Sequence, residues 1–258
     1  MINAYLGFVL AGSAVGAVSF LLAWRRTGLP MGWRVIGFLA GAVASGLAGA
    51  RAYALVEHGR TWEVAIGVEG GFRLPGAVVG LLLGLVVWRA VFLPRVALGV
   101  IGDFGAIAAQ FGLAVVRLGC LAQGCCFGTV CDLPWAIRFP LGSPAADTHA
   151  ALGLIGPADT ASLPVHPLQI YFMLLHLGVG ACLLRFERRK AYDGQLLLLA
   201  LLLGDGGKAL LEGFRQPIPG VPELHLRVAS ALLAGVAALA LIAMAVRSRR
   251  RVNVPVET

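Results

Sequence analysis

One arginine and a group of cysteines stand close together in the segment RLGCLAQGCCFG, residues 117–128. With one further cysteine downstream, the thiols have the spacing C-x4-C-C-x4-C: Cys120, Cys125, Cys126 and Cys131. Thiols at this spacing can form one or two disulfides, or one of them can act as a nucleophile whose pKa the Arg117 guanidinium lowers. The spacing matches no common zinc or iron–sulfur pattern, which generally uses C-x2-C pairs, so no metal site is expected.

Arg117 itself suggests a second kind of chemistry. A guanidinium group matches a phosphate bidentately, so an arginine at the end of an apolar segment can bind a lipid phosphate. The same position also suits an arginine that only extends its charge to the membrane surface. The residue alone leaves both interpretations open.

Three charged residues at helical spacing form another candidate site, namely Asp205, Lys208 and Glu212. Separations of three and four residues place them on one face of a helix. They can simply neutralise one another, or they can line a polar cavity in which the adjacent glycines leave room for a ligand.

The segment HPLQIY, residues 166–171, contributes hydrogen-bonding groups at the start of a predicted helix. A single interfacial histidine such as His166 is generally solvated. Together with Gln169 and Tyr171 it forms a turn rich in donors and acceptors, which suits a polar ligand.

The composition shows which elements must position these groups. The chain is 59% hydrophobic and only 13% charged, with a mean hydropathy of +0.84. A soluble domain is closer to half apolar and a quarter charged, so the sequence predicts an all-α integral membrane protein. The net charge of +8 does not indicate nucleic-acid binding, because the basic residues cluster at the ends of apolar segments.

Seven apolar runs are each long enough to cross a bilayer as a helix. They are about 4–24, 34–56, 74–93, 97–117, 168–185, 194–213 and 227–246. Basic residues follow the first, third, fifth and seventh runs, which predicts that these connections are cytoplasmic. The amino terminus is therefore expected outside and the carboxyl terminus in the cytoplasm.

The predicted organisation is a single membrane domain, residues 1–246, followed by a basic cytoplasmic tail, residues 247–258. The domain includes a long outer loop, about 118–165, in which Trp135 and Phe139 suit the membrane–water interface.

Polar residues inside a membrane are costly and are candidates for function by default. The predicted spans contain several beyond those already named: Arg51, Asp103, Gln110 and His176. We expect His176 to be a buried, hydrogen-bonded group.

Three motifs occur in order at the outer ends of the fourth, fifth and sixth predicted spans, namely VRLGCLAQGCCFG, HPLQIY and GKALLEGFRQP. Together they resemble the prolipoprotein diacylglyceryl transferase family. The resemblance implies seven spans in the bacterial cytoplasmic (inner) membrane, with a site that faces the outer leaflet. It implies transfer of a diacylglyceryl group from phosphatidylglycerol to the lipobox cysteine of a preprolipoprotein, which forms a thioether and releases glycerol phosphate. It implies no cofactor, and its partners are these two substrates and membrane lipids, not nucleic acid.

The resemblance also assigns roles to residues. Arg117 stands at the phosphate-contacting arginine and Lys208 at a catalytic arginine, so the two are expected to clamp the phosphate. Glu212 and His166 are the expected acceptors of the thiol proton. The expected substrate-binding residues are Tyr5, Gln123, Gly128, Gln169, Tyr171 and Arg215.

The chain departs from the family motif at several positions. Cys120 and Gln123 replace two asparagines, Cys125 replaces a glutamate, and Phe172 replaces another glutamate. The family's histidine-glycine-glycine appears as Leu74-Pro75-Gly76. These departures favour an alternative: a divergent paralogue of the same fold that binds lipid or undergoes thiol redox chemistry without transferring a diacylglyceryl group.

Overall fold

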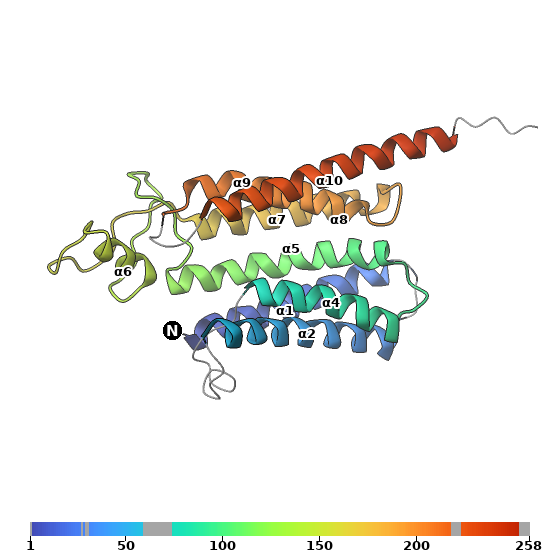
Figure 1. The fold of residues 1–258 in the computed structure, drawn as a ribbon, viewed down its shortest axis with the longest axis horizontal. Coiled ribbons are helices and arrows are strands. Elements are labelled where there is room, and N and C mark those ends of the chain that lie inside the picture. Colours follow the sequence, from blue (N-terminus) through green and yellow to red (C-terminus); the bar gives the residue numbers. More distant parts are fainter. Residues whose placement is uncertain (1, 27, 29–30, 59–73, 218–222, 253–258) are drawn as a thin grey trace, which may run out of the picture.

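The computed structural model describes residues 2–26, 28, 31–58, 74–217 and 223–252. Within these ranges the regular elements are helices, and strand-like pairing is limited to isolated bridges between loop segments. Figure 1 shows the long helices running along one common axis. The predicted all-α class is therefore confirmed for the described residues, and the arrangement is consistent with an integral membrane protein.

Six long helices follow six of the predicted apolar runs. Their bounds are α1 Ile2–Arg25, α2 Trp33–His58, α4 Leu74–Phe92, α5 Leu98–Gln123, α7 Leu168–Phe186 and α10 Glu223–Val252. Two short helices, α8 Gln195–Ala200 and α9 Gly206–Leu211, cover the remaining run. A short helix, α6 (Pro144–Ala151), lies in the long loop after α5. Helix α10 continues into the segment predicted as the tail, of which residues 253–258 lie outside the described residues.

Five of the described helices are long and apolar enough to cross a membrane, and they are Tyr5–Arg25, Trp33–Val56, Leu98–Gln123, Leu168–Arg189 and Arg227–Met244. The apolar helix Gly76–Phe92 is shorter. The predicted sixth span, 194–213, is not one regular helix, because a π-helical segment at Leu201–Asp205 separates α8 from α9. Five of the seven predicted spans are thus supported by helices of sufficient length and apolar character.

Helix α5 is the centre of the bundle. It packs against α1 on one side and against α7 and α8 on the other, as Figure 1 shows. The backbones of α1 and α5 approach closely at two glycines, since a Cβ on Gly12 would lie 2.7 Å from the Gly112 carbonyl oxygen. Small residues permit such close packing between helices in lipid.

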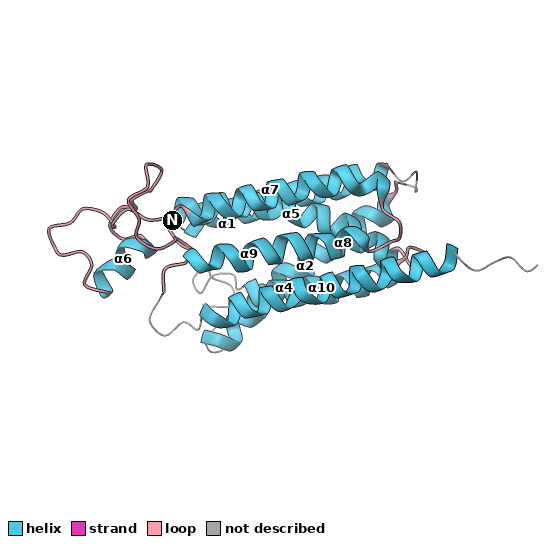
Figure 2. Cartoon of the chain, turned by 90° about the horizontal axis from the view of Figure 1, so that it is seen from above, coloured by secondary structure: helices cyan, strands magenta, loops and turns pink. Residues whose placement is uncertain are grey.

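The two ends of the bundle differ. Helix α6 and the loops around it lie at the end where α1 begins, which is seen in both views (Figures 1 and 2); we call it the α6 end. At the opposite end an aromatic cluster joins α1, α2 and α5. The ring centroids of Phe20 lie 5.8 Å from Phe38 and 6.0 Å from Phe104, and Trp24 lies 6.1 Å from Phe104.

Asp103 is fully buried near this opposite end and has a structural role. Its carboxylate accepts hydrogen bonds from Lys190 Nζ at 2.8 Å and from the backbone N–H groups of Gly194, Leu196 and Leu197. It therefore satisfies the free N–H groups at the start of α8. Burial lowers the pKa of Lys190, but its hydrogen bonds to Asp103 and Asp193 outweigh that effect and leave the pKa raised.

Replacing Asp103 by Asn should lower the apparent melting temperature of the detergent-solubilised protein by roughly 5–10 °C, because about 2–3 kcal/mol of ion pairing and helix capping is lost. Asp193→Asn is the matched control, since Asp193 contacts the same lysine, 2.8 Å away, but is half exposed. An equal shift in both variants would contradict the capping role.

The long loop forms a small core of its own at the α6 end. Phe127, Phe139, Ala145 and Val165 are buried together there. Phe139 is only 6% exposed, so its expected place at the membrane–water interface is wrong. The reason is that α6 and the neighbouring loop segments cover the ring, whereas Trp135 in the same loop is exposed.

Candidate functional site

Helix α5 extends about two turns beyond the predicted end at residue 117 and stops at Gly124, which has φ 72°. Arg117 is therefore a half-buried residue within the helix, not at its outer end as expected. Its guanidinium carbon lies 4.5 Å from the centroid of the Phe172 ring on α7, in a cation–π contact. No ion pair of Arg117 with a carboxylate is found among the described residues, which leaves its charge available to an anionic ligand.

Three cysteine thiols meet where α5 ends. The Sγ atoms of Cys120, Cys125 and Cys126 all lie within 4.8 Å of one another, while Cys131 is not part of the group. All of these cysteines are free thiols, so none of the disulfides considered from the sequence is formed. Cys126 has φ 59° and is the one non-glycine residue with positive φ in the described ranges, which indicates a locally strained turn.

The thiols of the turn differ in acidity. Hydrogen bonds with Cys120 and Cys126 raise the pKa of Cys125, and burial adds to the effect. Hydrogen bonds from Cys120 and Cys125 lower the pKa of Cys126, and the positive charges of Arg215 and Arg117 lower it further. The Cys126 sulfur is thus the one in this turn that most readily carries negative charge.

Glu212 and Arg215 form a two-pronged ion pair in the turn after α9. Arg215 Nη2 donates to Glu212 Oε1 at 2.8 Å, and Arg215 Nε donates to the other carboxylate oxygen. In the described residues Lys208 forms no ion pair with Asp205 or with Glu212. The polar stripe predicted on this helix is consequently not neutralised internally, because Glu212 turns to Arg215 instead.

Lys208 and Arg117 lie on different helices, α9 and α5, and both helices pack against α7. His176 Nδ1 lies 2.8 Å from Gln110 Oε1 on α5, which confirms the expectation of a buried, hydrogen-bonded histidine. Gln110 in turn packs beside the π-helical segment, where a Cβ on Gly204 would lie 3.2 Å from its amide nitrogen.

The HPLQIY segment joins the site through its first residue. His166 Nδ1 lies 3.3 Å from the Tyr171 hydroxyl, which accepts a hydrogen bond of 2.7 Å from Trp135 Nε1. The His166 ring also packs against Phe214, with centroids 5.4 Å apart. The sequence predicted neither this contact of Phe214 nor that of Phe172 with Arg117, although Phe214 matches the family motif and Phe172 departs from it.

Backbone hydrogen bonds tie the three motif segments together. The Gly128 N–H donates to the His166 carbonyl at 3.0 Å, and the Thr129 N–H donates to the Phe214 carbonyl at 2.8 Å. A Cβ on Gly128 would lie 2.6 Å from the His166 Cβ and 2.8 Å from the Phe214 oxygen. Gly128 is therefore a packing position at which the three segments meet.

The remaining predicted binding residues support this turn. Gln169 is fully buried and its Nε2 donates to the Cys125 carbonyl at 2.7 Å, while its Oε1 has no hydrogen-bond partner among the described residues. Gln123 Oε1 accepts a long contact of 3.9 Å from the Cys125 thiol. Tyr5 packs on Gly119, where a Cβ would lie 3.2 Å from the tyrosine ring. The structure thus brings Tyr5 on α1 to the thiol end of α5.

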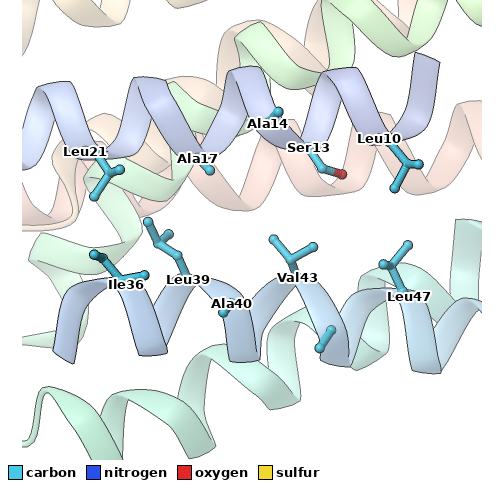
Figure 3. Close-up of a pocket in the computed structure, with 11 residues that line it drawn as sticks. Leu10, Ser13, Ala14, Ala17, Leu21, Ile36, Leu39, Ala40, Val43 and Leu47 are labelled. Atoms are coloured by element: carbon cyan, nitrogen blue, oxygen red, sulfur yellow. The ribbon is translucent and has the colours of Figure 1, made fainter. Parts of the chain in front are cut away.

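An apolar groove of about 480 Å³ lies between α1 and α2. Figure 3 shows side chains of the two helices facing each other across it, among them Leu10, Leu21, Leu39 and Val43. Ser13 is its one polar lining residue, and its hydroxyl donates to the Val9 carbonyl. The groove is suited to hydrocarbon and not to a charged headgroup.

The prolipoprotein diacylglyceryl transferase family matches residues 1–246 of the chain. Similar proteins named phosphatidylglycerol–prolipoprotein diacylglyceryl transferase occur in Mannheimia succiniciproducens (30% identity, covering 58% of this chain and 48% of the relative) and Vibrio vulnificus (36%, covering 57% and 48%). Another from Proteus mirabilis is 33% identical, covering 58% of this chain and 52% of the relative. The chain spans about half the length of these relatives. Since the family match extends over almost all of the sequence, the chain belongs to the prolipoprotein diacylglyceryl transferase family.

Proposed function

We propose that the chain transfers the diacylglyceryl group of phosphatidylglycerol to the lipobox cysteine thiol of a preprolipoprotein. The reaction forms a thioether and releases glycerol phosphate. One observation carries the proposal. The three motif segments, which contain Gly128, His166 and Phe214, meet at Gly128 at one end of the apolar bundle.

Arg117 and Lys208 bind the phosphate in this mechanism. Arg117 lacks a carboxylate partner among the described residues and rests on Phe172, which orients its guanidinium. Lys208 adds a second positive charge from α9, which packs, like α5, against α7. Cations placed where the leaving phosphate develops charge stabilise the transition state.

Glu212 and His166 are the groups that accept the proton of the acceptor thiol. Arg215 holds the Glu212 carboxylate through two hydrogen bonds, and Tyr171 with Phe214 holds the His166 ring. A thiol must lose its proton to become a nucleophile, so a fixed base near the phosphate clamp is required.

For the membrane arrangement, we propose seven crossings with the amino terminus outside and the α6 end facing the outer leaflet of the cytoplasmic membrane. Basic residues on alternate connections support this orientation. The groove between α1 and α2 is where an acyl chain of the lipid lies, since it is apolar and borders the helix that carries Tyr5.

A second candidate function is that of a thiol-redox or lipid-binding paralogue without transferase activity. The grouped free thiols of Cys120, Cys125 and Cys126 favour it. The two functions predict different results in a strain depleted of its own transferase.

The test is complementation of that strain, in which mass spectrometry detects modification of the lipobox cysteine. Transferase function predicts that the chain restores diacylglyceryl modification of a reporter preprolipoprotein. Normal membrane levels of the chain without any modified reporter would favour the paralogue.

Lys208→Arg should increase the transfer rate several-fold, because a guanidinium fork binds phosphate through two hydrogen bonds and lysine offers a single point charge. The rate is measured with labelled phosphatidylglycerol and a lipobox peptide. Arg138→Lys is the matched control, since Arg138 contacts the Ser162 carbonyl in the outer loop, away from the clamp. No change on introducing arginine at position 208 would argue against a phosphate contact there.

A further inference from the structure

The fold brings together three thiols whose sequence spacing gave no metal pattern. Cys120 lies in the last turn of α5, and Cys125 and Cys126 follow its glycine cap. The Cys125 N–H bonds back to the Cys120 carbonyl at 3.1 Å, and the positive φ of Cys126 turns the chain again. Two turns in succession point the side chains of three cysteines at one place.

The mutual spacing of the three Sγ atoms suits a single metal ion. They lie within 4.8 Å of one another. Zinc–sulfur bonds of about 2.3 Å in tetrahedral geometry require sulfur–sulfur separations of roughly 3.8 Å, which small side-chain rotations provide. A disulfide would use two of these sulfurs and leave the third without a partner.

The surroundings fit a thiolate site with one open position. Three thiolates and a divalent cation carry a net charge of about −1. Arg117 supplies positive charge nearby, since it precedes Cys120 by three residues and so lies on the same face of α5. Gln123 and Gln169 contact the thiol and the carbonyl of Cys125, which is the kind of support that orients metal ligands.

Access to the three sulfurs is unequal. Cys120 is buried, whereas Cys125 and Cys126 are only partly buried, so a further ligand can approach from one side. Zinc sites with three protein ligands leave their fourth position to water or substrate, whereas structural sites are closed by four protein ligands.

We propose that Cys120, Cys125 and Cys126 bind one Zn²⁺ ion whose fourth position receives the thiol of the acceptor protein. This inference rests on the transferase function proposed above and gives the acceptor a binding site.

The reaction at the metal is balanced as follows. The acceptor thiol binds zinc as a thiolate and its proton passes to Glu212 or His166. The thiolate sulfur then attacks the glyceryl carbon, a carbon–sulfur bond forms, and the carbon–oxygen bond to the phosphate breaks. Glycerol phosphate leaves with the electron pair, and the neutral thioether, a weaker ligand, dissociates from the metal.

Metal binding is measured first, on the full chain purified in detergent under reducing conditions. Elemental analysis should find about one equivalent of zinc in the wild-type protein. The affinity for zinc should fall roughly tenfold or more in the Cys120→Ser, Cys125→Ser and Cys126→Ser variants. Cys182→Ser is the matched control and should retain the metal, because Cys182 lies elsewhere on α7. Absence of bound zinc from the reduced wild-type protein, or a Cys125–Cys126 disulfide in its place, would overturn the proposal.

The open position is tested with Co²⁺ in place of zinc. A lipobox peptide should change the visible absorption of the cobalt protein, and the same peptide with serine for cysteine should not. An unchanged spectrum with the cysteine peptide would refute thiol binding at the metal.

Transfer activity then separates this inference from the proposed function. The inference predicts that chelation abolishes transfer and that added zinc restores it. Full transfer by the metal-free protein would refute the metal site and leave the transferase function standing. Metal binding and a peptide-dependent spectrum without any transfer would refute the transferase function instead.

Discussion

Arg117→Ala is expected to reduce kcat/KM for diacylglyceryl transfer by about 10²–10³-fold, because in the proposed mechanism it removes a cation that stabilises the leaving phosphate. The guanidinium rests on Phe172 and has no carboxylate partner among the described residues, so its charge is not already neutralised. Transfer from labelled phosphatidylglycerol to a lipobox peptide measures the effect.

Two further variants make this prediction specific. Arg117→Lys keeps the positive charge but loses the two-pronged hydrogen bonding of the guanidinium group, so it should retain only part of the wild-type activity. Arg138→Ala removes an arginine of the outer loop that contacts the Ser162 carbonyl, and should leave transfer unchanged. Full activity of the alanine variant at position 117 would refute the mechanism.

Gly128→Ala is expected to cost at least tenfold in transfer and to lower the melting temperature by several degrees, because overpacking of this kind costs about 1–3 kcal/mol. The added Cβ would lie 2.6 Å from the His166 Cβ and 2.8 Å from the Phe214 carbonyl oxygen. The segments that carry His166 and Phe214 must then separate, which moves His166, the proposed base, away from the proposed phosphate site.

Gly105→Ala is the control for this substitution. Gly105 lies in helix α5, and a Cβ there would meet nothing within 4 Å. Alanine at that position should preserve activity and slightly raise stability, since alanine favours helix over glycine. Thermal unfolding and transfer are measured on both variants, and equal behaviour would show that Gly128 is not a packing position.

Much of the fold could be predicted because it depends on local composition. Apolar runs of sufficient length must become helices in a bilayer, where each backbone group needs an internal partner. The ends of the helices were less predictable. Helix α5 continues past Arg117 through Leu121, Ala122 and Gln123, which favour helix, and Gly124 first provides a left-handed cap.

The sequence pattern also did not predict the interruption of the sixth span. Within the run 194–213, residues 196–203 are uniformly apolar, and no proline marks a break. The π-helical segment at Leu201–Asp205 packs at Gly204 against Gln110 of α5. Such a segment reflects tertiary contacts and is frequent near functional sites.

The sequence by itself determined the helical membrane class, the order of the three motifs and the candidacy of Arg117, His166 and Glu212. These follow from residue type and spacing, which act locally. Tertiary structure alone decided the partners: Glu212 pairs with Arg215 and not with Lys208, Asp103 caps α8, and Gly128 joins three segments. It also decided that three cysteines converge, because the φ angles of Gly124 and Cys126 set directions that spacing does not reveal.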